Sequence, residues 1–178
     1  MDTFRQTYLD ETIAVYRQHQ QWAEAALAQL GDTPRFFQPL GPRSHSVAIT
    51  VKHVAGNLRS RWLHFLNEDG EKPDRHRDQE FVITPNDTHA SLMTAWQAAW
   101  QILYAELGAL QPEDLEKTVT IRGEKLSVPR AIQRSLAHTA YHTGQIMYLC
   151  RLLKEGDWNW LTIAPGQSQE YNRGTNMK

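Results

Sequence analysis

Residues 137–150, AHTAYHTGQIMYLC, place two histidines four positions apart immediately before an apolar segment. Positions spaced by four lie one turn apart on the same face of an α-helix, so the imidazoles of His138 and His142 point the same way. In steps of three and four, the predicted core-facing series of this helix is Ala131, Ser135, His138, His142, Gln145, Leu149 and Leu152. Its ends are apolar, but its middle is polar. Because buried hydrogen-bonding groups cost free energy unless each has a partner, the pattern indicates a site within a helical core.

Three more amphipathic segments accompany this helix, separated by connections that contain proline and glycine. Gly31 follows the first segment, as glycine often follows a helix end, and Ser46 is the predicted N-cap of the second. The four predicted helices extend from Asp2 to Leu30, from Val47 to about Asn67, from Asp87 or Thr88 past Leu107, and from Ser127 or Val128 to near Gly156. Four such helices favour an all-α fold, a four-helix bundle.

The segment TVTIRGEKLSV, residues 118–128, breaks the helical pattern between the third and fourth helices. Val119 and Ile121 alternate with polar residues there, and a glycine-containing turn precedes Leu126. This pattern predicts a short β-hairpin, with an irregular loop as the alternative. At 178 residues the chain is long enough to bury a substantial core, so residues 1–178 are predicted to form a single helical-bundle domain.

The C-terminal segment DWNWLTIAPGQSQEYNRGTNMK, residues 157–178, shows neither helical nor strand periodicity. Its apolar side chains are nevertheless expected to pack onto the bundle, whereas the last polar residues are expected to fray. The apolar side chains are those of Trp158, Trp160, Leu161 and Ile163.

The charge balance argues against several classes of partner. Nineteen Lys and Arg residues against twenty Asp and Glu residues give a formal net charge of -1, which disfavours binding to nucleic acid or to an anionic membrane. The apolar runs are shorter than the roughly 18 residues of a membrane span, and the opening MDTFRQTYLDET lacks the pattern of a signal peptide. A cytoplasmic location is expected. The single cysteine, Cys150, is expected to pack as a small buried apolar residue.

A second polar line lies on the predicted helix that starts at Val47. His53, Asn57, Arg61 and His64 recur there at spacings of three and four, beside the apolar line Val54, Leu58, Trp62 and Phe65. If the polar line faces the middle of the fourth helix, His53 becomes a third ligand for a metal bound by His138 and His142. Three neutral imidazoles without a fourth protein ligand are typical of a catalytic zinc site, in which water or substrate takes the open position. Imidazole also suits nickel, iron and copper.

The polar side chains near these histidines have more than one interpretation. Asn57, one turn beyond His53, could orient a ligand or substrate, or it could satisfy backbone groups in the bundle. Arg61 is predicted to line the substrate pocket. Gln145 and Ser135 could fix the orientation of the imidazoles, or they could form an ordinary buried hydrogen bond.

A long charged connection, EDGEKPDRHRDQEFVITPND, covers residues 68–87 between the second and third helices. Connections of this length usually carry a function or pack as units. Its charged residues could form a salt-bridged cap or help to bind a charged substrate, with simple solvation as the alternative. The residues concerned are Arg75, Arg77, Asp78 and Glu80.

The segments VKHVAGNLRSRWLHFLNEDGEKPDRHRDQEF (51–81) and AHTAYHTGQIMYL (137–149) resemble the DinB/YfiT-like superfamily of small bacterial proteins, specifically a branch of unknown function. The resemblance rests on one histidine in the second helix and an H-x-x-x-H motif in the fourth, and it extends to TVTIRGEKLSV and IAPGQSQEYN. It implies an up-down-down-up four-helix bundle in which His53, His138 and His142 bind a divalent metal, with zinc or nickel as the leading candidates. It also implies a homodimer built on helix packing.

Characterised members of that superfamily include metal-dependent transferases, which join low-molecular-weight thiols such as bacillithiol or mycothiol to electrophiles, and a thiol-dependent isomerase. The leading hypothesis is therefore a metal-dependent thiol S-transferase that acts on small electrophiles in a pocket near Asn57, Arg61 and Gln145. A metal-dependent hydrolase is an alternative, for which Glu80 would have to supply the missing carboxylate from the loop. A non-enzymatic metal-binding or stress-related interaction protein is another. The long charged loop distinguishes this branch from the characterised transferases.

Overall fold

Five α-helices and one two-stranded hairpin account for most of residues 2–175, the part of the chain that the computed structural model describes. The elements are α1 (Asp2–Leu30), α2 (Val47–Trp62), α3 (His89–Ala109), β1 (Thr118–Ile121), β2 (Glu124–Ser127), α4 (Val128–Leu153) and α5 (Ser168–Thr175). Short 3-10 helices lie in the connections: η1 (Pro34–Phe37), η2 (Arg77–Phe81) and η3 (Pro112–Glu116). The predicted fold, largely helical with a hairpin between the third and fourth helices, is confirmed at this level.

Side-chain caps define the starts of the three inner helices. The Ser46 hydroxyl accepts a hydrogen bond from the backbone N–H of Ile49. The Thr88 hydroxyl accepts a hydrogen bond from the backbone N–H of Ser91. Ser127 caps α4 in the same way. Each cap satisfies a backbone donor that would otherwise lack a partner in the first helical turn. The predicted helix starts are therefore confirmed.

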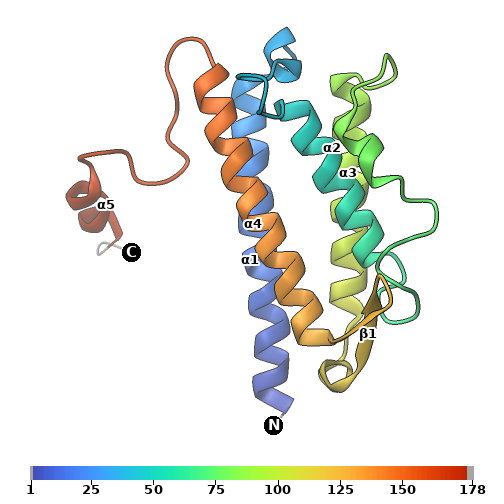
Figure 1. Ribbon diagram of the computed structural model, residues 1–178. Helices are drawn as coiled ribbons and strands as arrows, with labels where there is room; N and C mark the ends of the chain where they lie inside the picture. The colour runs from blue at the N-terminus through green and yellow to red at the C-terminus, as the bar shows by residue number, and fades with distance from the viewer. Residues whose placement is uncertain (1, 176–178) are drawn as a thin grey trace.

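The four long helices lie side by side, and each packs mainly against two of the others (Figure 1). Helix α1 packs against α4 and α3, while α2 packs against α3 and α4. In the view of Figure 1, α1 and α4 run upward and α2 and α3 run downward. Because α2 and α3 run in the same direction, the connection between them has to return along their length, which explains why it is long. Within residues 2–175, no helix combines the length and apolar character needed to cross a membrane.

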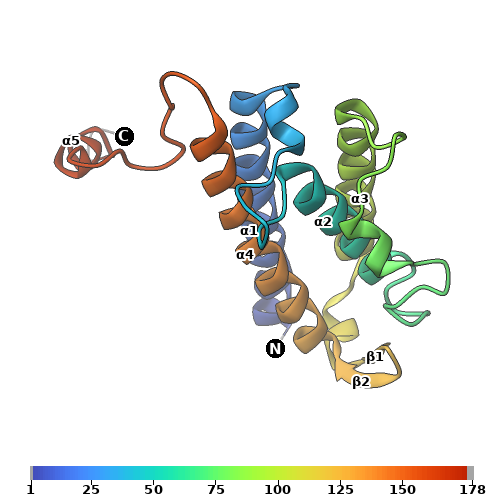
Figure 2. The same ribbon diagram turned by 45° about the horizontal axis from the view of Figure 1, so that its top comes forward.

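The hairpin closes at one end of the helices, beside the start of α4 (Figure 2). Strands β1 and β2 are antiparallel, with Val119 opposite Leu126. Arg122 and Gly123 form the two-residue turn, and both have positive φ (56° and 75°). Such a turn matches the twist of the strands and favours glycine at its second position. The alternation of residues that predicted the hairpin therefore matches the observed pairing.

Aromatic side chains fill the core between the helices. Tyr16, Trp62, Trp96 and Trp100 are among the largest fully buried side chains. The ring of Tyr16 meets Trp62 edge to face, with centroids 5.9 Å apart and an interplanar angle of 87°. The Trp62 indole N–H donates a hydrogen bond to the Ser135 hydroxyl at 3.0 Å, so a buried polar contact joins α2 to α4. Cys150 is buried as predicted, and burial raises the pKa of its thiol to about 12.

The second helix ends at Trp62, earlier than the predicted Asn67. The cause is Glu106 of α3, whose carboxylate accepts hydrogen bonds from the backbone N–H groups of His64 (3.0 Å) and Phe65 (3.2 Å). These bonds draw the chain out of the helix, and His64 adopts a positive φ of 54°. Its side chain is exposed and does not continue the polar line that starts at His53.

The C-terminal segment packs less completely than predicted. Trp158 and Leu161 lie against the core, but Trp160 and Ile163 are 45% and 42% exposed. Two hydrogen bonds attach the segment to the end of α1. The Gln29 side-chain amide donates to the Asn159 carbonyl and accepts from the Asn159 backbone N–H. Beyond it the chain forms α5, which the sequence pattern did not predict and which stands apart from the other helices in Figures 1 and 2. The fraying predicted for the last residues falls partly on 176–178, outside the described residues.

Removing the hydrogen bond between Trp62 and Ser135 is expected to destabilise the protein by a measurable amount. Ser135→Ala leaves a buried indole N–H without its acceptor, which costs about 1–3 kcal/mol. Trp62→Phe removes the donor and part of the packing, so its cost should lie in the same range or above it. Because both changes delete one bond, urea unfolding of the double variant should show a loss about 1 kcal/mol smaller than the sum. Additive losses would contradict the coupling.

Candidate metal centre

His138 and His142 lie beside the buried stripe of α4 rather than on it. The stripe consists of Val128, Ala131, Ile132, Ser135, Thr139, Thr143, Ile146, Cys150 and Leu153. Both histidines are half-buried, whereas Gln145 and Leu152 of the predicted core-facing series are exposed. From His138 onward, the predicted core-facing series therefore lies one position before the residues that are buried. The reason lies in Thr139, whose hydroxyl donates to the Ser135 carbonyl at 3.0 Å and so is satisfied inside the core.

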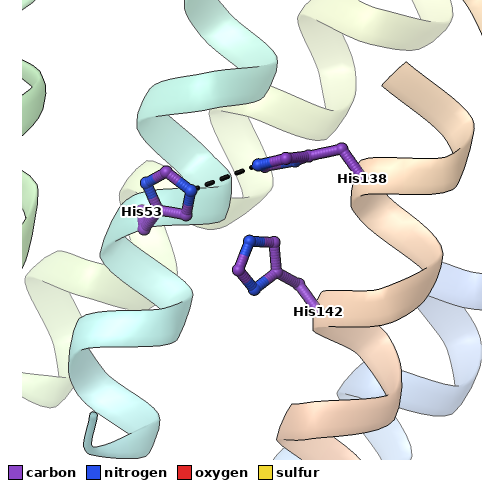
Figure 3. A group of neighbouring side chains, drawn as sticks. All are labelled: His53, His138 and His142. Atoms are coloured by element: carbon purple, nitrogen blue, oxygen red, sulfur yellow. Dashed lines mark hydrogen bonds between the residues drawn. The ribbon is translucent and has the colours of Figure 1, made fainter. Parts of the chain in front are cut away.

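His53 of α2 approaches this edge of α4 and brings the three predicted histidines together (Figure 3). Its Nε2 atom lies 3.2 Å from Nε2 of His138. One ring nitrogen from each of His53, His138 and His142 falls within a cluster whose members are all within 4.8 Å of one another. His53 is only 5% exposed, so the cluster is buried on the α2 side and more open on the α4 side. Three histidines are thus close enough to hold a metal ion.

Hydrogen bonds to the outer nitrogens turn the rings toward the cluster. Nδ1 of His53 lies 2.8 Å from Oε2 of Glu80, and Nδ1 of His142 lies 2.7 Å from Oε1 of Gln145. Both partners are oxygen acceptors, so each Nδ1 carries the proton and each Nε2 presents its lone pair. Neutral histidines in this tautomer are suitable metal ligands.

The geometry and the unpaired nitrogens both fit a bound cation. Nε2 of His142 and Nδ1 of His138 are buried without a hydrogen-bond partner among the described residues. Buried polar atoms without partners are uncommon, and a cation between the rings would satisfy His142. Four ligands at the zinc–nitrogen distance in a tetrahedron are about 3.3 Å apart. The pair His53 and His138 already has this spacing, at 3.2 Å, whereas the three nitrogens together lie within 4.8 Å, so the rings would close in slightly around an ion. The donor set of three imidazoles suits several transition metals.

Burial keeps two of the imidazoles neutral. The pKa of His138 is lowered to about 3, chiefly by burial and then by its neighbours His142 and His53. The pKa of His142 is lowered to about 4, again chiefly by burial, which outweighs the opposing effect of the hydrogen bond with Gln145. Both rings are therefore unprotonated at neutral pH. A metal ion would not have to displace protons from them.

Glu80 is the carboxylate that orients His53, and it comes from η2 in the long charged connection. Besides His53, it accepts hydrogen bonds from Arg75 at 2.8 Å (Nε to Oε1) and 3.0 Å (Nη2 to Oε2). Burial alone would raise the pKa of Glu80, but the bonds from His53 and Arg75 outweigh burial and lower it. An ionised carboxylate behind a ligating histidine is a common device for fixing the ring and raising its basicity. The salt-bridged cap expected of this loop is formed by Arg75 and Glu80.

Gly56 makes room for this carboxylate and was missed from the sequence. A Cβ atom at Gly56 would lie 2.8 Å from Cδ of Glu80 and still closer to Oε1, which no real side chain tolerates. Glycine one turn beyond His53 therefore lets the loop approach α2. A glycine inside a helical pattern often marks such a close approach of another segment, and that signal was available in VAGNL.

Two of the other predicted site residues, Asn57 and Arg61, line a small cavity next to the histidines. The cavity has a volume of about 230 Å³, and His53 and His138 form part of its wall. Asn57, which is buried, and Arg61 line it as well, whereas Gln145 lies outside it and supports His142 instead. The remaining lining residues are Arg75, Arg77, Ile121, Arg122, Ala131, Arg134, Ser135 and Tyr141.

A protein-family model matches residues 3–167 of the chain. The matched family is described as a protein of unknown function, DUF1572. The chain belongs to the DUF1572 family. No curated protein and no solved structure matches it. The family assignment therefore supplies no activity, and the chemistry of this DUF1572 protein has to be inferred from the residues around the three histidines.

Displacing Glu80 is expected to weaken metal binding although no imidazole is changed. Gly56→Ala pushes the carboxylate off His53, and Glu80→Gln replaces it by a neutral amide, so each should weaken zinc binding about 10- to 100-fold. Competition with a chromophoric chelator measures the change. Gly108→Ala on α3, where a Cβ atom would meet nothing within 4 Å, is the matched control. Equal zinc affinity in Gly56→Ala and Gly108→Ala would contradict the role of Glu80.

The metal-free protein is expected to lose stability as the pH falls below about 6.5, the pKa of an unperturbed histidine. In the folded protein the pKa of His138 is about 3 and that of His142 about 4, so in this range only the unfolded chain takes up these protons. Their uptake favours unfolding progressively down to about pH 4. Urea unfolding at pH 7.5 and pH 5, with a chelator present, should show the loss. A His138→Gln, His142→Gln variant should lose less, and an equal loss would contradict the assignment.

Proposed function

We propose that this protein is a metal-dependent enzyme in which His53, His138 and His142 hold one divalent ion and leave a coordination position open to substrate. The observation that carries the proposal is the convergence of three imidazoles, two of which line a cavity. Among the described residues, these three are the only His, Cys, Asp or Glu side chains that gather closely enough to hold an ion. Three protein ligands with an open position are the usual arrangement of a catalytic zinc site, whereas structural sites have four.

When bound, the ion would supply Lewis acidity, which lowers the pKa of a coordinated water or thiol. The residues of the chain have separate tasks around it. Glu80 and Gln145 hold the rings of His53 and His142 in their ligating orientation. Asn57 and Ser135 line the cavity in which a substrate would lie. Zinc or nickel is the proposed ion, because imidazole ligands suit both.

Within this proposal, transfer of a thiol to a small electrophile is favoured over hydrolysis. Hydrolysis usually needs a free general base near the water. Glu80 reaches the site from the loop, but both of its oxygens already accept hydrogen bonds from Arg75 or His53. None of the described residues that line the cavity is a carboxylate. A low-molecular-weight thiol requires no such base once the ion has lowered its pKa.

Kinship with the DinB/YfiT-like superfamily is part of the same proposal. The directions of the four long helices in Figure 1 agree with the up-down-down-up bundle of that superfamily. The proposal includes a homodimer formed through helix packing. It also includes a cytoplasmic location. The alternative is a non-enzymatic metal-binding or stress-related interaction protein, and a fourth protein ligand would favour it. The described part of the chain brings together three ligands, which supports the enzyme instead.

Replacing the histidines provides the direct test of the metal site. The purified protein, incubated with zinc or nickel and then desalted, is expected to retain about one ion per chain. His53→Ala, His138→Ala and His142→Ala should each lower the affinity by more than about a hundredfold, because each removes a ligand. His76→Ala, an exposed histidine of the charged loop, is the control and should bind normally. Failure of the unaltered protein to retain either metal would overturn the proposal.

The reaction is tested separately from the metal. Several low-molecular-weight thiols are mixed with monochlorobimane and the metal-loaded protein, and thiol consumption is followed. Transfer activity should appear with at least one thiol and should vanish in His53→Ala but not in His76→Ala. Metal retention without turnover of any thiol would contradict transfer while leaving the metal site intact.

A further inference from the structure

Five arginines line the cavity beside the histidines, and no acidic residue in the described part of the chain joins them there. The arginines come from four separate regions of the chain. They are Arg61 of α2, Arg75 and Arg77 of the charged loop, Arg122 of the hairpin turn and Arg134 of α4. Five arginines around a cavity of only about 230 Å³ are unexpected in a chain whose net charge is -1.

Three of these arginines are needed to hold the loop in place. Glu71 is their shared partner, at 2.8 Å from Arg61, 3.3 Å from Arg75 and 3.1 Å from Arg122. Arg75 also binds Glu80. These three guanidinium groups share the carboxylates of Glu71 and Glu80. Burial, together with repulsion from Arg75 and Arg122, lowers the pKa of Arg61.

The other two arginines have no comparable structural task. The closest carboxylate oxygen to Arg134 belongs to Glu124, at 3.5 Å, and both side chains are about half exposed or more. Arg77 pairs at 3.2 Å with its neighbour Asp78, which is 94% exposed, and its guanidinium lies over the ring of Phe81. Exposed pairs of this kind contribute little to stability. Their positions on the cavity wall are therefore not explained by folding.

Arg61 also has donors to spare. It contacts the Gly70 carbonyl, Ser60 and Glu71 through one nitrogen, Nη1. None of the described residues accepts a hydrogen bond from its Nε or Nη2. A planar guanidinium with free donors is suited to bind the two oxygens of a carboxylate or phosphate.

We propose that the cavity binds the carboxylate or phosphate group of a small molecule, held by Arg61 at the inner wall and by Arg77 and Arg134 at the rim. The inference rests on the proposed function, because the same molecule would extend from these arginines to the three histidines. It narrows the substrate to a small anion that also carries a donor for the metal. A cavity of about 230 Å³ limits the enclosed part to a group of modest size.

Binding is measured on the full-length, metal-free protein, so that the result does not depend on a metal. Inorganic phosphate, malonate and neutral malonamide are titrated by calorimetry at low ionic strength, where screening of charges is small. Phosphate or malonate should bind, and malonamide should bind at least tenfold more weakly because it lacks the charge. The stronger of the two anions identifies which acid group the cavity prefers. Equal binding of malonate and malonamide would overturn the proposal.

Variants locate the binding to the arginines. Arg134→Gln and Arg77→Gln should each weaken anion binding about tenfold, since each removes a charged contact. Arg130→Gln, an exposed arginine one turn earlier on α4 that does not line the cavity, changes the net charge equally and should have no effect. Arg61→Lys keeps the charge at the inner wall in case Arg61→Gln does not fold, and it should bind more weakly than the unaltered protein.

The outcomes separate this proposal from the metal site. Retention of zinc together with equal anion affinity in Arg134→Gln, Arg77→Gln and Arg130→Gln would overturn the anion site alone. Anion binding that depends on Arg134 and Arg77 in a protein that retains no metal would support the cavity while contradicting the proposed enzyme. Absence of phosphate and malonate binding would overturn the inference whatever the metal result.

Discussion

The hydrogen bond between Glu80 and His53 fixes two parts of the molecule at once. On the α2 side it sets the tautomer and direction of the most buried imidazole, and on the loop side it anchors η2 against the helix. Arg75 keeps the carboxylate ionised, and Gly56 leaves the space in which it sits. Without this contact, His53 could rotate and the loop would lose one of its attachments near the cavity. The candidate site therefore depends on a residue that is not itself a ligand.

Local chemistry explains why the sequence predicted most of the helices and the three histidines. Ser46, Thr88 and Ser127 cap helices through bonds to residues three positions away, and a capping pattern of this kind is visible in sequence. The spacing of His138 and His142 is likewise local. Their partner His53 was found because its own helix repeats polar residues at three and four. Features encoded within one or two turns of a helix are the ones that pattern reasoning recovers.

Contacts between distant segments account for what pattern reasoning missed. Helix α2 ends where Glu106, about forty positions later in the chain, accepts a backbone hydrogen bond. The residues near Leu63 therefore contain no signal for the end of the helix. The face of α4 was misplaced because Thr139 and Thr143 act as core residues once their hydroxyls are satisfied, a property that hydrophobic periodicity does not register. The histidines consequently stand at the border of the core. That position gives both rings low dielectric surroundings and places His138 on the wall of the cavity.

Arg75 connects the histidine cluster with the arginine-lined cavity. One guanidinium bonds to Glu80, behind the metal ligand His53, and to Glu71, behind the arginines of the cavity. A displacement of Arg75 would therefore alter its bonds to both Glu80 and Glu71. Thermodynamic linkage then requires reciprocity: an occupant of the cavity that alters the affinity for the ion must have its own affinity altered by the same factor. Arg75 is thus bonded to supports of both proposed positions, so a change at this side chain would disturb both.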